Sequence, residues 1–115
     1  MKFRLFLATL LISLFSFSQQ VKSPSEFLGY ELGTTFSRHH QVIEYYKYLA
    51  EVLPEVVQLK TYGTTNEGRE LLLAFVSTPS NINNLENIRK EHLEALNGNV
   101  ASEKALVWLS YNVHG

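Results

Sequence analysis

The chain has 115 residues, of which 45% are hydrophobic, 18% charged and 12% aromatic, and its formal net charge is −1. These values fit one small folded domain and argue against disorder, and the ten basic residues form no run that would indicate a nucleic-acid-binding surface or a polybasic membrane patch. The absence of cysteine excludes disulfides, thiolate metal sites and cysteine nucleophiles.

Residues 1–18 have the three parts of a secretory signal peptide. Lys2 and Arg4 give a basic start, residues 5–17 form an apolar run, and serines occupy both positions that a signal peptidase reads, the second being Ser18. A helix of that run would span about 20 Å, less than the roughly 30 Å of a membrane core, and it has no polar face with which to join a domain surface. We expect cleavage after Ser18, export to the periplasm or outside the cell, and no stable membrane anchor afterwards.

The next part of the chain predicts a lead-in and a first helix. Residues 19–36 are a lead-in segment, in which residues 26–35 contain two glycines and are expected to form an ordered loop. Ser37 is placed to cap a helix over residues 38–53, where apolar residues recur at spacings of three and four. Pro54 ends this helix.

Two strands are predicted after the first helix. Residues 56–62 are rich in β-branched side chains, and residues 70–77 contain a continuous apolar run that is typical of a strand covered on both faces. The intervening residues 63–69 include Gly68, which tolerates a positive φ and indicates a turn. We expect the two strands to pair antiparallel.

A second helix and a third strand complete the predicted elements. Residues 82–96 are expected to be helical, and the Asn-Gly-Asn sequence at 97–99 ends them. Residues 105–111 form another apolar run of strand length. Five apolar residues share one face of the predicted helix: Ile82, Leu85, Ile88, Leu93 and Leu96.

This order of helices and strands predicts an α/β fold, namely an incomplete α/β/α sandwich with a mixed β-sheet. The strand at 105–111 is apolar enough to be central, yet few neighbouring strands are encoded. We therefore expect residues 37–115 to be the truncated amino-terminal part of a domain.

Four histidines are candidate metal ligands, because a neutral imidazole is the commonest protein ligand for a metal. His114 follows the predicted last strand, at the edge where loops of α/β sheets converge, although a lone histidine there is more often an ordinary loop residue. His39 and His40 would point about 100° apart on a helix, a poor arrangement for chelation. His92 is expected to be a partly buried structural residue.

Three segments, in this order, resemble the amino-terminal third of the zinc carboxypeptidase family, the carboxypeptidase A-like metallopeptidases. They are the helix with its terminal proline, residues 37–54; the turn containing Glu-Gly-Arg, residues 62–69; and the strand ending in His-Gly, residues 107–115. With residues 27–30, they are particularly similar to an exported bacterial branch of that family.

The resemblance implies a Zn²⁺ enzyme that hydrolyses peptide bonds at the carboxyl termini of peptide or protein substrates. The family motif is His-x-x-Glu, so His114 is the implied first zinc ligand, and the glutamate ligand would stand two residues after Gly115. A second histidine and the catalytic glutamate come later still in the family, so no catalytic residue is assigned and the chain alone is expected to be inactive. Arg69 is assigned to the turn and to a structural role.

Two other functions remain open at this point. A related zinc amidase or deacylase would act on peptidoglycan peptides or acyl-amino acids. A small exported binding or structural domain without any chemistry is the alternative from a different class.

Overall fold

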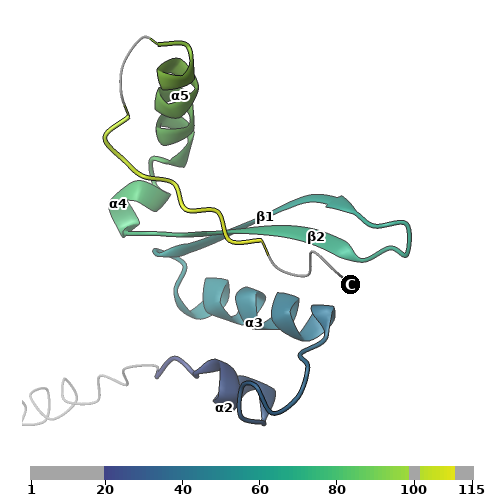
Figure 1. The fold of residues 1–115 in the computed structure, drawn as a ribbon. Helices are drawn as coiled ribbons and strands as arrows, with labels where there is room; N and C mark the ends of the chain where they lie inside the picture. The colour runs from purple at the N-terminus through teal and green to yellow at the C-terminus, as the bar shows by residue number, and fades with distance from the viewer. Residues whose placement is uncertain (1–19, 99–101, 111–115) are drawn as a thin grey trace, which may run out of the picture.

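A computed structural model of the protein describes residues 20–98 and 102–110. The predicted signal peptide and His114 lie outside these residues. The described part contains both helices and strands, which confirms the coarse α/β class, and none of its helices is long and apolar enough to cross a membrane. Figure 1 shows the elements in chain order: α2 (Pro24–Leu28), α3 (His39–Val52), β1 (Val57–Thr64), β2 (Glu70–Val76), α4 (Pro79–Ile82) and α5 (Leu85–Leu96).

The two strands form an antiparallel hairpin, as predicted. The register runs from Val57 opposite Val76 to Thr64 opposite Glu70, with an irregularity between Thr61 and Gly63. Alternating hydrogen bonding in such a ladder ties each strand to its partner along its length. The hairpin therefore gives the described chain its only sheet, and that sheet has two strands.

The hairpin turn depends on a glycine in the left-handed region. Gly68 has φ 76°, and its N–H donates to the Thr65 carbonyl at 2.9 Å. The turn is closed by the Thr65 N–H, which donates to the Arg69 carbonyl at 2.8 Å. The prediction of a turn with positive φ at this position is confirmed.

Replacing Gly68 with alanine is expected to lower the free energy of unfolding by about 1–2 kcal/mol, the usual cost of a left-handed conformation for a residue with a Cβ. A Cβ at this position would meet no atom within 4 Å, so the expected loss comes from backbone strain alone. Urea denaturation measures it. Gly63→Ala is the matched control: Gly63 lacks a positive φ, and its added Cβ would make an ordinary 3.7 Å contact with Leu71. Equal effects of the two substitutions would contradict this explanation.

Helix α3 forms where its apolar spacing predicts, and it lies along one face of the hairpin, as Figure 1 shows. The predicted cap at Ser37 is wrong. The Ser37 hydroxyl accepts a hydrogen bond from the Tyr30 hydroxyl at 2.8 Å, and the capping position is taken by Arg38, whose N–H donates to the Gln41 side chain at 2.9 Å. Ser37 is therefore a contact for the preceding loop.

Helix α2 corrects the prediction that residues 19–36 contain only a lead-in and a loop. Ser23 and Glu26 form a capping box: the Glu26 N–H donates to the Ser23 hydroxyl at 3.3 Å, and the Ser23 N–H donates to the Glu26 carboxylate at 2.7 Å. Pro24 occupies the first helical turn, and Gly29, at φ 77°, ends the helix. These features compensate for the short length of this helix.

Helix α2 is held against α3 by aromatic rings. The ring of Phe27 lies 5.2 Å from that of Tyr45 and 5.1 Å from that of Tyr48, between ring centroids. The backbone of Lys22 adds two hydrogen bonds, to the Tyr48 hydroxyl at 2.8 Å and from the Tyr45 hydroxyl at 3.1 Å. The lead-in is thus docked onto the helix that follows it.

The helix predicted over residues 82–96 is two helices, α4 and α5, separated by Asn83 and Asn84. Asparagine side chains compete with helical hydrogen bonding, which explains the break. Ile82 and Ile88 are buried as predicted, whereas Leu93 and Leu96 are exposed. The apolar face is therefore covered only in its first half.

The strand predicted over residues 105–111 does not form within the described residues. Residues 105–110 pair with no strand, and the exposed fractions of Leu106, Val107, Trp108 and Leu109 are 68–82%. β2 is likewise not covered on both faces: its first six residues are only partly buried, and Val76 is 66% exposed. The expected mixed sheet is absent from the described part, because an apolar strand is buried only where neighbouring strands and helices cover it.

Candidate functional site

The predicted metal ligand, His114, lies outside the described residues, so the structure does not bring it together with any partner. Within residues 20–98 and 102–110, no three His, Cys, Asp or Glu side chains lie close enough to hold a metal ion. The described residues therefore do not form a zinc site, and no step of a zinc reaction is assigned to them.

His39 and His40 begin α3 and point into a shallow groove between that helix and the hairpin turn. The groove has a volume of about 250 Å³ and is lined by His39, His40, Ile43, Glu44, Lys47, Arg69 and Glu70. Two histidines at the start of a helix were predicted to be poor chelators, and they join no metal-binding group in the described chain. The groove is a mixed-charge surface formed where α3 packs on the hairpin.

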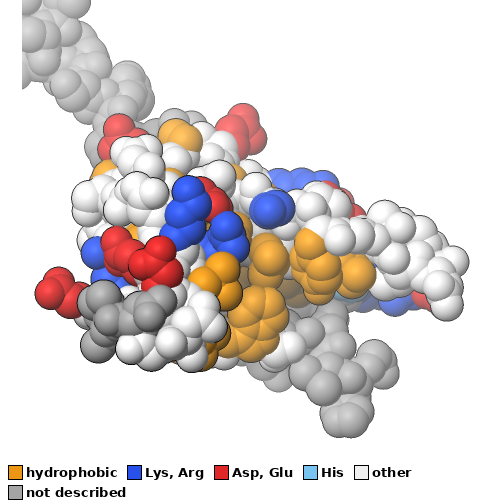
Figure 2. All heavy atoms as spheres, turned by 90° about the horizontal axis from the view of Figure 1, so that it is seen from above, with side chains coloured by type: hydrophobic (Ala, Val, Ile, Leu, Met, Phe, Trp, Pro, Cys, Tyr) orange, Lys and Arg blue, Asp and Glu red, His pale blue; other side chains and the backbone are white. Residues whose placement is uncertain are grey.

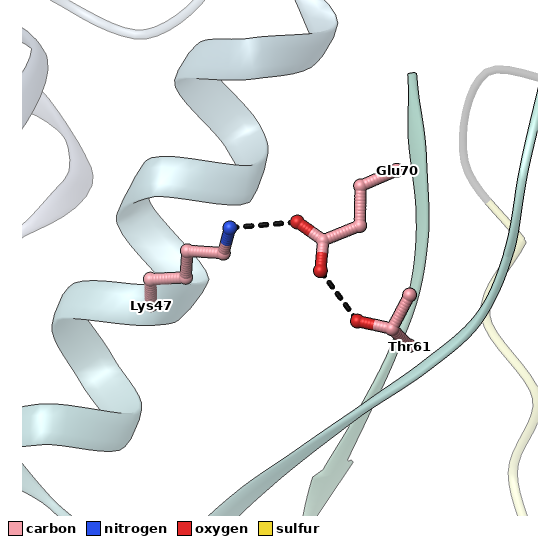
Figure 3. Close-up of polar contacts among 3 residues, drawn as sticks. All are labelled: Lys47, Thr61 and Glu70. Carbon is pink, nitrogen blue, oxygen red and sulfur yellow. Dashed lines mark hydrogen bonds and ion pairs between the residues drawn. The ribbon is translucent and has the colours of Figure 1, made fainter. Parts of the chain in front are cut away.

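A carboxylate at the edge of this groove links three elements. Glu70 of β2 accepts a hydrogen bond from Lys47 of α3 at 2.6 Å and a second from the Thr61 hydroxyl of β1, as Figure 3 shows. The Lys47 bond, followed by the Thr61 bond, lowers the pKa of Glu70 below its ordinary value, and the charge of His39 adds to this effect. The contact therefore pins the helix to both strands when Glu70 is ionised.

Replacing Glu70 with glutamine is expected to lower the Tm at neutral pH. A carboxyl whose pKa is depressed by folding stabilises the protein above its unfolded pKa and loses this contribution as the pH falls through the folded pKa. The gap in Tm between parent and variant should thus shrink below about pH 4. Thermal unfolding at neutral pH and at about pH 3 measures this.

Glu51→Gln is the control for that experiment. Glu51 is exposed on the same helix and makes no hydrogen bond or ion pair within the described residues. We expect its substitution to leave the Tm unchanged at both pH values. A Glu70→Gln variant with the same Tm as its parent at neutral pH would show that the contact contributes nothing to stability.

Arg69, the arginine of the Glu-Gly-Arg turn, is held by local contacts. Its guanidinium pairs with Glu67 at 2.7 Å, and its N–H donates to the Thr65 hydroxyl at 3.1 Å. Both side chains of the ion pair are exposed, so the pair contributes little to stability. These contacts agree with the structural role expected for Arg69.

A second hollow, of about 470 Å³, lies between α2 and α3. Burial of the Tyr45 phenol at its edge raises the pKa of that group, and the neighbouring Tyr48 and Glu26 add to the rise, so Tyr45 stays uncharged. The lining offers packing surface and no acid, base or nucleophile suited to catalysis: Pro24, Leu28, Leu32, Ser37, Val42, Tyr45, Tyr46 and Leu49.

His92 is partly buried, as predicted, and both of its ring nitrogens face backbone carbonyl oxygens. Nδ1 lies 2.8 Å from the Ile88 oxygen and Nε2 lies 2.8 Å from the Lys104 oxygen. A ring held in this way has no free lone pair for a metal. The sequence indicated the structural role but not the partners, because Lys104 lies twelve residues away along the chain.

The described residues thus form polar contacts that hold the elements together, without a catalytic set among them. No protein-family model, curated protein or solved structure matches the chain.

Proposed function

We propose that the complete protein is an exported zinc metallocarboxypeptidase and that residues 37–115 are the first part of its catalytic domain. It would hydrolyse the terminal peptide bond at the carboxyl end of peptide or protein substrates. The proposal is supported by three segments that resemble this family and occur in one order: the helix, the Glu-Gly-Arg turn and the apolar segment leading to His114.

The observation that carries the proposal is the exposed apolar segment immediately before His114. Leu106, Val107, Trp108 and Leu109 leave most of their surface in water, and Val76 of β2 does the same. Figure 2 shows hydrophobic side chains gathered beside the projecting hairpin, on the side away from α3. Contiguous exposed apolar surface of this kind is typical of a region that another part of a protein covers.

The same observation supports the finer fold. A hairpin with a helix along one face has half of the layers that an α/β/α sandwich requires. An apolar segment of strand length is suited to the interior of such a sheet, where both faces are covered. We therefore propose that residues 105–111 join the sheet as a central strand in the complete protein, and that this strand delivers His114 to the sheet edge.

The test compares the product of the uninterrupted coding sequence with the 115-residue chain. We expect the longer product to contain about one zinc ion per active site and to release carboxyl-terminal amino acids from peptides, with chelation removing the activity and zinc restoring it. The 115-residue chain should do neither. A coding sequence without glutamate two residues after Gly115, or a longer product that binds no zinc, would overturn the proposal. Release of acyl groups without peptide hydrolysis would identify the related deacylase instead.

A further inference from the structure

The imidazole of His92 joins two segments that are separate in the sequence. Its Nδ1 lies 2.8 Å from the carbonyl oxygen of Ile88, one turn earlier on α5. Its Nε2 lies 2.8 Å from the carbonyl oxygen of Lys104, in the segment that leads to the exposed apolar residues. Both distances are those of good hydrogen bonds.

These two contacts specify the protonation state of the ring. A carbonyl oxygen can only accept a hydrogen bond, so each ring nitrogen must carry a proton to bond its carbonyl. A neutral imidazole has one N–H, and only the imidazolium has two. We propose that protonated His92 is a pH-sensitive latch that holds residues 102–104 against α5, and that loss of the ring proton releases one of the two carbonyls.

Ser102 offers the neutral ring a different partner. Its hydroxyl lies 3.2 Å from Nδ1 and 3.3 Å from Nε2, and it can donate to whichever nitrogen has lost its proton. Deprotonation then exchanges a bond that reaches Lys104 for a bond that reaches Ser102. The link to Lys104, or the return link to Ile88, is lost in the exchange.

No carboxylate in the described chain is paired with the ring, so its charge is stabilised by the two carbonyls. On α5, Glu86 pairs with Arg89 at 2.6 Å. The adjoining helix α4 carries no titratable residue. The other charged residues of α5 and of the latched segment are exposed: Lys90, Glu91, Glu94, Glu103 and Lys104. The pH response therefore depends on the hydrogen bonds of the ring and needs no ion pair.

The latch acts on the apolar segment that follows it. Lys104 stands two residues before Leu106, the first of four consecutive apolar residues that are largely exposed. Histidine changes charge between about pH 5 and 8, so the segment is fixed to α5 at the acid end and freed at the alkaline end. The latch thus controls how mobile this apolar surface is.

Trp108 is the only tryptophan of the chain, and its fluorescence anisotropy reports the mobility of this segment. In the 115-residue chain, we expect the anisotropy to fall as the pH is raised from about 5 to about 8. His92→Gln should abolish this pH-dependent step. His40→Gln and His114→Gln should retain it, since neither residue belongs to the latch.

Far-UV circular dichroism checks that each variant keeps its helices. A direct measurement on the parent chain makes the test independent of the variant's folding: ¹⁵N-edited NMR of the ring should show two hydrogen-bonded N–H protons at about pH 5 and one at about pH 8. A step in anisotropy that survives in His92→Gln, or a ring with only one bonded N–H at acid pH, would overturn the latch.

Discussion

Replacing Ile88 with alanine is expected to lower the free energy of unfolding by about 2–5 kcal/mol. Ile88 is only 5% exposed and is one of three buried hydrophobic residues in the described part of the chain, with Val57 and Ile82. Small domains have a total stability of about 5–15 kcal/mol, so this loss would leave much of the chain unfolded. Urea denaturation followed by far-UV circular dichroism measures it.

Leu96→Ala on the same helix is the matched control for Ile88→Ala. Leu96 is 83% exposed, so its truncation removes little buried surface, and we expect a change within about 0.5 kcal/mol. Both substitutions introduce the best helix former, so helix propensity does not separate them. Similar losses for the two variants would show that the first turns of α5 do not belong to the core.

The elements that sequence patterns predicted well are those set by short-range signals. The three- and four-residue spacing predicted α3, and the β-branched and apolar runs on either side of Gly68 predicted the hairpin. The missed helix α2 had a signal of the same kind. Ser23, Pro24 and Glu26 form the capping box pattern, which is recognisable from the spacing of these residue types alone.

The features that could not be predicted depend on contacts between distant parts of the chain. His39 and Arg69 share a groove only because α3 packs on the hairpin, and no spacing in the sequence encodes that distance. The burial of residues 105–110 depends on which elements cover them, so their apolar character alone could not say that they are exposed here. The same limit applies to the candidate metal site. Its one predicted residue is a histidine whose proposed partners are not in the described chain.

The exposed apolar segment and the proposed zinc site are linked by their order in the sequence. His114 stands five residues after Leu109, so a strand that includes residues 105–111 would fix the backbone just before the ligand. A ligand supported by a rigid strand loses less freedom when it binds a metal than one on a mobile tail. The strand and the histidine are therefore expected to act together in the complete protein.

Replacing His114 with alanine in that complete protein is expected to remove bound zinc and to lower kcat/KM for peptide hydrolysis by about 100-fold or more, because even residues that only support a metal ligand cost up to about 100-fold. Zinc content per protein and release of carboxyl-terminal amino acids measure the two effects. His40→Ala, which removes an exposed histidine from α3, is expected to change neither. A His114→Ala protein that keeps its zinc and its activity would place the metal on other residues and remove His114 from the site.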